Sequence, residues 1–248
     1  MDTTHPTPIF FAPQIKTMRA LCEKAMPCLV DHFSKIPQTD AATPTELATS
    51  LSQFFDILGA VDNCKQNIAS TEDMPDMANH GLHLIDEPNK WAAELQCHDA
   101  SDAFKQLTIA LAVWATEHNF LLSHIHTLVE AISQQANQTQ DTQFLSKLSD
   151  ISDSIISAIA PNITEDADKS APERPWRVLN LNHGIITTRS LDTKRMELAF
   201  ERLLYRLPDD AAHFFAEGMK QMDIIDYPEN VREVIKNYYQ LTNQPTLQ

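Results

Sequence analysis

The scarcity of glycine restricts the folds open to this chain more than any other feature. Only four glycines occur in 248 residues, and the two nearest to each other, Gly59 and Gly81, lie 22 positions apart. Hairpin turns, β-bulges and phosphate-binding loops use glycine because it adopts positive φ angles without steric cost. A P-loop or a dinucleotide fingerprint also needs glycines within about six residues of each other. The sequence therefore excludes these nucleotide-binding motifs and argues against a turn-rich β fold.

Helix-start signals recur along the first two thirds of the chain. In TPTELATSLSQFFDIL, Thr43 is a candidate N-cap, Pro44 takes the first helical position and Glu46 completes a capping box. Apolar residues follow at helical spacing from Leu47 to Leu58. Pro27 and Gly59 are positions where two of the expected helices can bend or break. This reasoning predicts helices over residues 13–36, 44–69, 75–87, 88–96, 100–118, 120–136 and 142–160.

Two polar stretches interrupt the helical pattern. Residues 134–143 (QQANQTQDTQ) predict a loop, and residues 161–175 (PNITEDADKSAPERP) predict a linker rich in proline and charge. The helix starts expected after this linker are 17, 17 and 19 residues apart. Two successive helices would therefore form a hairpin that repeats close to the tetratricopeptide period. The small residues that such repeats place at helix contacts are mostly missing. These starts are Pro175, Asp192, Asp209 and Pro228.

Together these signals predict an all-α protein. We expect an antiparallel helical array or bundle over residues 1–160, the linker over 161–175, and a helical-hairpin region, tetratricopeptide-like or α-solenoid-like, over 176–248. The two helical regions can also pack into one domain. Within the second region, residues 177–189 (RVLNLNHGIITTR) alternate in a way that also suits a short β-hairpin, but their apolar residues share a helical face and favour a helix.

The net charge of −15 is unevenly distributed. Residues 1–168 hold 23 acidic against 8 basic side chains, whereas residues 169–248 hold 11 of each. An acidic surface repels nucleic acid and anionic lipid, so neither is an expected partner. The sequence contains no apolar run of the ~18 residues that span a bilayer, and its start lacks the pattern of a signal peptide. We therefore expect a cytoplasmic protein.

Four cysteines and ten histidines are the candidate metal ligands. Cys22, Cys28, Cys64 and Cys97 form no CxxC pair, which favours reduced, mostly buried thiols over a zinc site or a disulfide framework. No cofactor is predicted on this basis. Neither a G-x-S-x-G elbow nor an HExxH motif occurs in the sequence, so no catalytic residue is assigned.

A stripe of histidines and carboxylates on the expected helix 75–87 is the strongest pattern for a metal. Asp76, His80, His83 and Glu87 follow one another at steps of 4, 3 and 4 and so share a helical face. At ~1.5 Å rise per residue the ends of this stripe lie roughly 16 Å apart. At most His80 and His83 with one neighbouring carboxylate can therefore hold one ion. The alternative is a solvated or interface-facing helix surface.

Two shorter patterns are explained more simply without a metal. His126 and Glu130 are neighbours at i, i+4, but one such pair does not make a site. Asp210 and His213 have the D-x-x-H spacing found in di-metal bundles. Because Asp210 follows Pro208 at an expected helix start, it is better explained as an acid that complements the helix dipole.

Residues 169–206 form a basic segment within this acidic protein. They hold eight basic against four acidic side chains. One interpretation is recognition of a carboxylate- or phosphate-bearing partner, because guanidinium groups bind such anions in a bidentate manner. The other is neutralisation of the acidic first region within the same chain. The candidate anion- or partner-binding residues are Arg174, Arg177, Arg189, Arg195, Arg202 and Arg206.

The sequence as a whole favours a non-enzymatic helical protein that binds another protein or acts as a scaffold. Helical arrays bind partners through grooved faces, and the methionine and aromatic content of FFAEGMKQMDIIDYP suits either an adaptable groove or a core. The alternative is a metal-binding protein or enzyme that uses the stripe Asp76, His80, His83 and Glu87 in a helical bundle.

Overall fold

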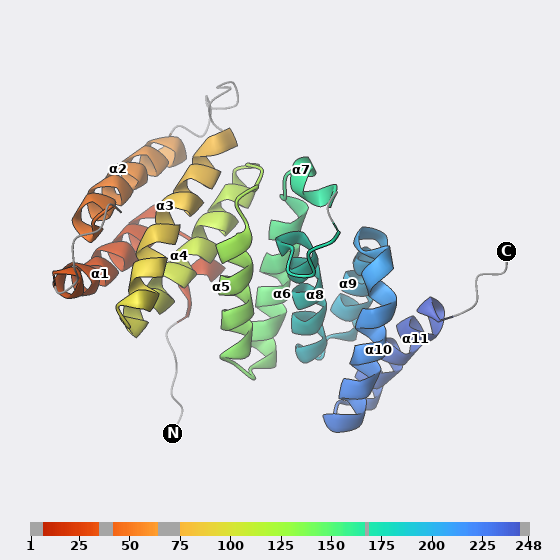
Figure 1. Cartoon of the computed structure of the whole chain (residues 1–248). Helices are drawn as coiled ribbons and strands as arrows, with labels where there is room; N and C mark the ends of the chain where they lie inside the picture. Colours follow the sequence, from red (N-terminus) through yellow and green to blue (C-terminus); the bar gives the residue numbers. More distant parts are fainter. Residues whose placement is uncertain (1–6, 35–41, 64–74, 167–168, 244–248) are drawn as a thin grey trace. The chain divides into compact units, whose positions relative to one another are not determined.

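The computed structural model describes residues 7–34, 42–63, 75–166 and 169–243 (Figure 1). These residues form eleven α-helices, packed antiparallel, and one short 3-10 helix, and they contain no β-strand, so the all-α prediction is confirmed. None of the helices in these ranges is both long and apolar enough to cross a membrane. The elements are η1 Ile9–Phe11, α1 Ile15–Phe33, α2 Pro44–Asn63, α3 Pro75–Glu94, α4 His98–Glu117, α5 His126–Asn137, α6 Thr142–Ser157, α7 Pro161–Thr164, α8 Pro175–Arg189, α9 Thr193–Arg206, α10 Pro208–Ile224 and α11 Glu229–Thr242.

The capping box at the start of α2 is confirmed. The backbone N–H of Thr43 donates to Glu46 Oε2 at 2.8 Å, and the backbone N–H of Glu46 donates to Thr43 Oγ1 at 3.3 Å. These bonds to Thr43 hold the pKa of Glu46 below its usual value. The helix then continues through Gly59 to Asn63, so it does not break at the glycine. The rest of the predicted helix, residues 64–69, lies outside the described residues.

The predicted boundary between helices 75–87 and 88–96 is wrong. A single helix, α3, runs through Pro88 to Glu94. Proline removes one backbone hydrogen bond and bends a helix, but burial on both sides of it can still maintain the helix. Here Ile85 before the proline and Trp91 after it are both buried, in a helix that packs extensively on α4. Tertiary packing therefore outweighs the local breaker.

The predicted helix 120–136 begins too early. Helix α5 starts only at His126, because the preceding segment is extended and bonded to distant parts of the chain. The N–H of Leu122 donates to Ala158 O and the N–H of Ala160 donates to Leu122 O, both at 2.9 Å. The expected linker 161–175 also contains the short helix α7. Residues 177–189 lie in α8, so the helical interpretation of that segment is confirmed over the hairpin.

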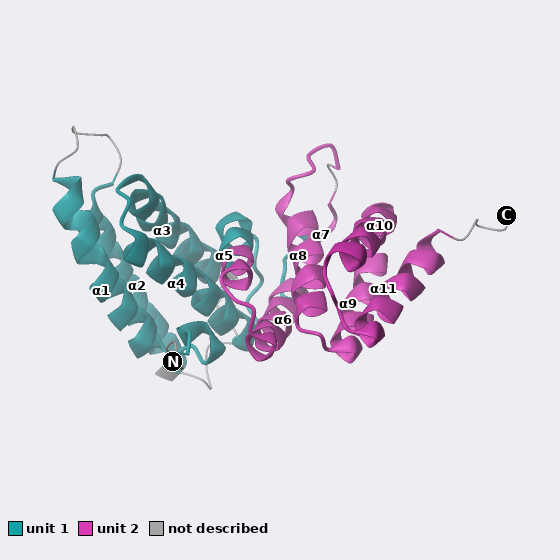
Figure 2. Cartoon of the chain, turned by 90° about the horizontal axis from the view of Figure 1, so that it is seen from below, with its two compact units in different colours: residues 1–131, 158–163 teal, residues 132–157, 164–248 magenta. Residues whose placement is uncertain are grey.

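The chain divides into two compact units, which Figure 2 shows in teal and magenta. Unit 1 comprises residues 1–131 and 158–163, and unit 2 comprises residues 132–157 and 164–248. The division falls within α5, and α6 belongs with α8–α11 rather than with the first four helices. The predicted division into regions 1–160, 161–175 and 176–248 stays a prediction.

In unit 1, helix α4 is the most deeply buried element. It packs against α1, α3 and η1, and its residues Phe104, Leu107 and Trp114 are at most 2% exposed. Gly81 of α3 allows close approach to this core, because a Cβ at that position would lie 2.1 Å from Phe54 Cζ. A glycine in a helix interior is unfavourable by itself, so its presence here is explained by packing.

In unit 2, the core combines aromatic rings with a small buried polar cluster. Phe200, Phe215 and Tyr238 pack with ring centroids 5.1 to 5.4 Å apart. Between α6 and α8, Ser149 Oγ lies 3.2 Å from His183 Nε2 and 2.9 Å from Thr187 Oγ1. Burial lowers the pKa of His183 to about 4, so its imidazole is neutral at pH 7.

Candidate metal-binding sites

Three donor side chains of unit 1 converge between α3 and the segment before α5. We call His83, Asp86 and His124 the histidine–aspartate cluster. Their ligand atoms all lie within 4.8 Å of one another. His124 Nε2 is hydrogen-bonded to Asp86 Oδ2, and His83 Nδ1 lies 3.8 Å from the same oxygen. The two imidazole rings meet edge to face, with centroids 5.2 Å apart.

The surroundings of the cluster fix its carboxylate and one of its rings. Asp86 is 6% exposed, and its second oxygen, Oδ1, accepts a hydrogen bond from Thr127 Oγ1 at 2.7 Å. The amide oxygen of Asn79 accepts hydrogen bonds from the backbone N–H groups of Ser123 and His124, at 2.8 and 3.1 Å, respectively. Asn79 thus holds the extended segment in the position that brings His124 to Asp86.

The predicted stripe on α3 is only partly represented in this cluster. His83 belongs to it, but the His80 ring lies against Phe54, with the two ring centroids 6.4 Å apart, and Glu87 pairs instead with Lys90 at 2.6 Å. Asp76 is exposed at the start of the helix. Sequence reasoning missed Asp86 because this residue does not lie on the helical face that the stripe occupies. It missed His124 because this residue lies 38 positions after Asp86 in the sequence.

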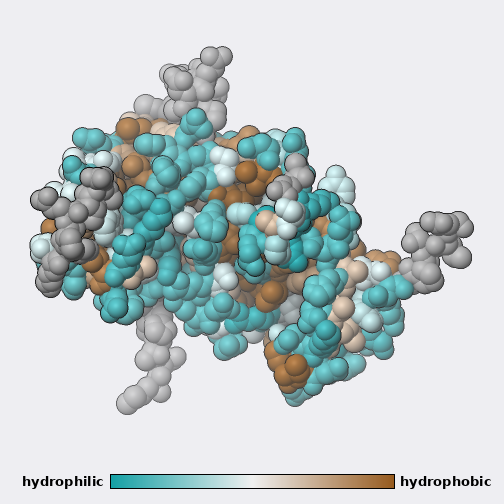
Figure 3. Space-filling model, in the orientation of Figure 1, coloured by the Kyte–Doolittle hydropathy of each residue, from teal (hydrophilic) through white to brown (hydrophobic). Residues whose placement is uncertain are grey.

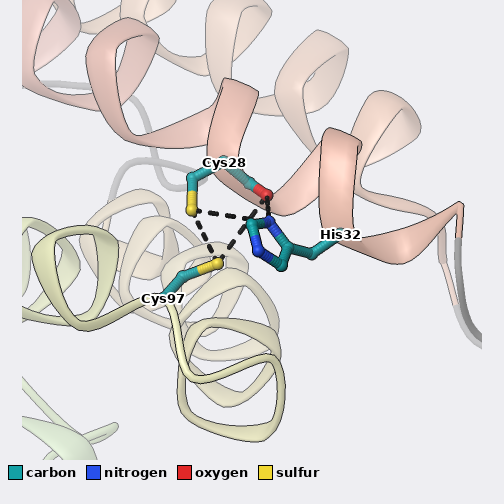
Figure 4. Close-up of side chains that lie close together, drawn as sticks. All are labelled: Cys28, His32 and Cys97. Carbon is teal, nitrogen blue, oxygen red and sulfur yellow. Dashed lines mark hydrogen bonds between the residues drawn. The ribbon is translucent and has the colours of Figure 1, made fainter.

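A second cluster in unit 1 joins α1 to the start of α4 (Figure 4). We call Cys28, His32 and Cys97 the thiol–imidazole cluster. Cys28 Sγ lies 2.7 Å from Cys97 Sγ and 3.8 Å from His32 Nδ1. Cys28 is half-buried, Cys97 is buried and His32 is exposed. A search of the sequence for CxxC pairs could not find this arrangement, because Cys28 and Cys97 are 69 residues apart in the sequence.

The six candidate arginines all have partners within unit 2. Arg174 and Arg177 both bind Asp210, and Arg174 also binds Asp166 through Nε at 2.7 Å. Arg195 binds both carboxylate oxygens of Asp150, at 2.8 and 2.9 Å. The remaining three contact an aspartate, a backbone carbonyl and an amide: Arg202 with Asp153, Arg189 with Thr139 O, and Arg206 with Asn180 Oδ1. Recognition of an external anion by these residues stays a prediction.

The two shorter patterns have local explanations. His126 Nε2 lies 3.5 Å from Glu130 Oε1 on an exposed face of α5. Asp210 lies in the first turn of α10 and is engaged by the two arginines, whereas His213 on the same helix is exposed.

A groove lies between α1 and α2. It has a volume of about 420 Å³. Its apolar lining includes Met26, Val30 and Phe55, and charged groups such as Arg19 and Glu23 border it. Arg19 is held in place by Asp56, at 2.5 Å between Nη2 and Oδ1.

Comparisons of the chain with protein-family models, with curated proteins and with solved structures find no match.

Proposed function

We propose that unit 1 binds a divalent transition-metal ion at the histidine–aspartate cluster. The observation that carries this proposal is the convergence of two imidazoles on one oxygen of a buried carboxylate. Two histidines and a carboxylate are the protein ligands of many non-haem iron sites and of several zinc enzymes. This proposal replaces the stripe Asp76, His80, His83 and Glu87 with a set that includes one of its four residues.

The geometry suits a site with open coordination positions. Thr127 holds one oxygen of Asp86, which leaves Oδ2 directed at His83 and His124. An ion takes the place of the proton between Asp86 and His124, and the His83 ring moves inward to complete the set. The His83 side chain is 70% exposed, so solvent or a small ligand reaches the remaining positions.

Binding of Zn²⁺ to metal-free protein tests this proposal. We expect one equivalent to bind in a Cys28→Ser background, which removes one of the two thiols of the thiol–imidazole cluster, and to be lost when His83→Ala and His124→Ala are added. Bound metal also increases the free energy of unfolding, by about 3 kcal/mol at a hundredfold excess of metal over Kd, and so raises the unfolding midpoint. Equilibrium dialysis with elemental analysis measures the stoichiometry.

His80→Ala is the matched control, because His80 is also an exposed histidine of α3 but lies outside the cluster. It should leave zinc binding unchanged. If His80→Ala removed the ion, or if the double His83/His124 variant retained it, the cluster would not be the site.

We also propose, as a second candidate, that the groove between α1 and α2 binds an apolar segment of a partner protein. Its size and its methionine-containing apolar lining favour this function, since such grooves accommodate helical peptides. Figure 3 shows hydrophobic residues among the hydrophilic ones on the face of the molecule that it draws. The spacing of the starts of α8 to α11 supports the finer proposal of hairpin repeats in unit 2.

Val30→Asp should weaken partner binding through this groove, because Val30 lines the groove, is 39% exposed, and would be replaced by a charged side chain. Ile57→Asp is the control, as Ile57 is 53% exposed on α2 and does not line the groove. Quantitative mass spectrometry of proteins captured from the source cells measures the difference. Equal capture by both variants would argue against the groove, and loss on charge reversal at Arg195 and Arg202 would favour the basic segment instead.

A further inference from the structure

The thiol–imidazole cluster brings together three soft or borderline metal donors from two helices. Cys28 and His32 are one helical turn apart on α1, and Cys97 is the N-cap residue of α4. A ring nitrogen of His32 and the two sulfur atoms lie within 4.8 Å of one another. Figure 4 shows the two sulfur atoms and the imidazole ring turned toward the same point.

The histidine of this cluster is held in the tautomer that metal binding requires. His32 Nδ1 lies 2.8 Å from the carbonyl oxygen of Cys28. A carbonyl oxygen only accepts hydrogen bonds, so Nδ1 carries the proton and Nε2 keeps its lone pair. A backbone carbonyl that binds the second ring nitrogen in this way is a common outer-shell feature of metal-ligating histidines.

Cys22 is a third cysteine of unit 1 that does not belong to the thiol–imidazole cluster. Cys22 lies on the same helix, but it is 4% exposed and burial raises its pKa to about 12. It therefore remains a protonated thiol at neutral pH. Cys28, in comparison, is half-buried and lies beside both an imidazole and a second thiol.

We propose that Cys28, His32 and Cys97 bind a thiophilic d¹⁰ cation, with Zn²⁺ as the ion that fits best. Both thiols lose their protons to solvent, so each bound ion releases two protons. Zinc–sulfur bonds of about 2.3 Å in tetrahedral geometry separate the two sulfurs by about 3.8 Å. The sulfurs, now 2.7 Å apart, separate by rotation of their side chains. Because His32 is exposed, the fourth position opens to solvent.

This site is independent of the histidine–aspartate cluster and is tested with that cluster disabled. Full-length protein with His83→Ala and His124→Ala is titrated with Co²⁺, a spectroscopic substitute for Zn²⁺, in the presence of a phosphine reductant. We expect a thiolate-to-cobalt charge-transfer band that saturates at one equivalent and is displaced by Zn²⁺. His32→Ala should weaken binding by more than about 100-fold, since loss of an outer-shell partner alone costs about 10- to 100-fold.

Cys28→Ser should abolish the band, whereas Cys22→Ser, the matched cysteine of α1, should leave it unchanged. In the unsubstituted chain, Zn²⁺ should protect Cys28 and Cys97 from alkylation, as measured for each cysteine by peptide mass spectrometry. That measurement does not depend on the folding of any variant. Absence of the band at saturating Co²⁺, or recovery of a Cys28–Cys97 disulfide that excludes metal under these reducing conditions, would overturn the proposal.

Discussion

Replacement of Asp210 by alanine is expected to destabilise unit 2 by about 3 kcal/mol. Asp210 accepts hydrogen bonds from Arg174 Nη2 at 3.0 Å and from Arg177 Nε at 2.6 Å. The side chain of Asp210 is 18% exposed and that of Arg174 only 12%. Removal of one partner of a largely buried ion pair costs about 3–5 kcal/mol, because the remaining charge stays desolvated. Arg174 keeps its bond to Asp166, so the lower end of this range is expected here.

Asp209→Ala is the matched control for this prediction. Asp209 is the preceding residue in the same first turn of α10, but it is 71% exposed and pairs with Lys169, which is also exposed. Solvent screens such a pair, so a much smaller loss of stability is expected. Urea unfolding followed by circular dichroism measures both variants, and hydrogen exchange in α8 and α10 places the effect within unit 2. Equal losses for the two variants would contradict the role given to burial.

The second large effect is expected from pH, through His183. The folded-state pKa of His183 is lowered to about 4 by burial, against about 6.5 for an unfolded histidine. Between these two values the unfolded chain binds a proton that the folded chain does not. The free energy of unfolding therefore falls as the pH is lowered from about 6.5 to 4, by about 3 kcal/mol in total, and is fully restored above pH 6.5.

His183→Gln should remove this contribution, because glutamine does not titrate and its amide can still reach Ser149. We expect a smaller dependence of unfolding free energy on pH between 6.5 and 4.5, measured by urea titrations at fixed pH. His213→Gln, at an exposed histidine of α10, should keep the dependence of the unsubstituted chain. An identical pH dependence for His183→Gln and the unsubstituted chain would show that another group is responsible.

Both effects depend on ionisable side chains that are largely buried in unit 2. Asp153, Arg202 and Arg206 all act electrostatically on His183, the aspartate raising its pKa and the arginines lowering it. The sequence left two interpretations of the basic segment open, recognition of an external anion and neutralisation of acidic groups within the chain, and two of its arginines act on the buried His183 of this unit. An external anion would have to compete with carboxylates already bound to Arg174, Arg177, Arg195 and Arg202.

The helices themselves were predictable where their signals are local. The capping box of Thr43 and Glu46 starts α2, and the Asp192 side chain caps α9 by accepting the N–H of Arg195 at 3.1 Å. Such signals act within one helical turn, so they are present in the sequence itself. The two helix boundaries that failed, at Pro88 and at residues 120–125, were decided instead by packing on α4 and by hydrogen bonds to Asn79, Ala158 and Ala160.

By itself, the sequence determined that this chain is helical, because scarce glycine, helix caps and 3.6-residue periodicity all act over short distances along the chain. It also identified His83 as a potential ligand, but not the residues that accompany it. Only the tertiary structure brought Asp86 to His124 and Cys28 to Cys97, across 38 and 69 residues of sequence, respectively. The physical reason is that the packing of helices on one another sets which distant side chains meet, and local spacing does not specify that packing.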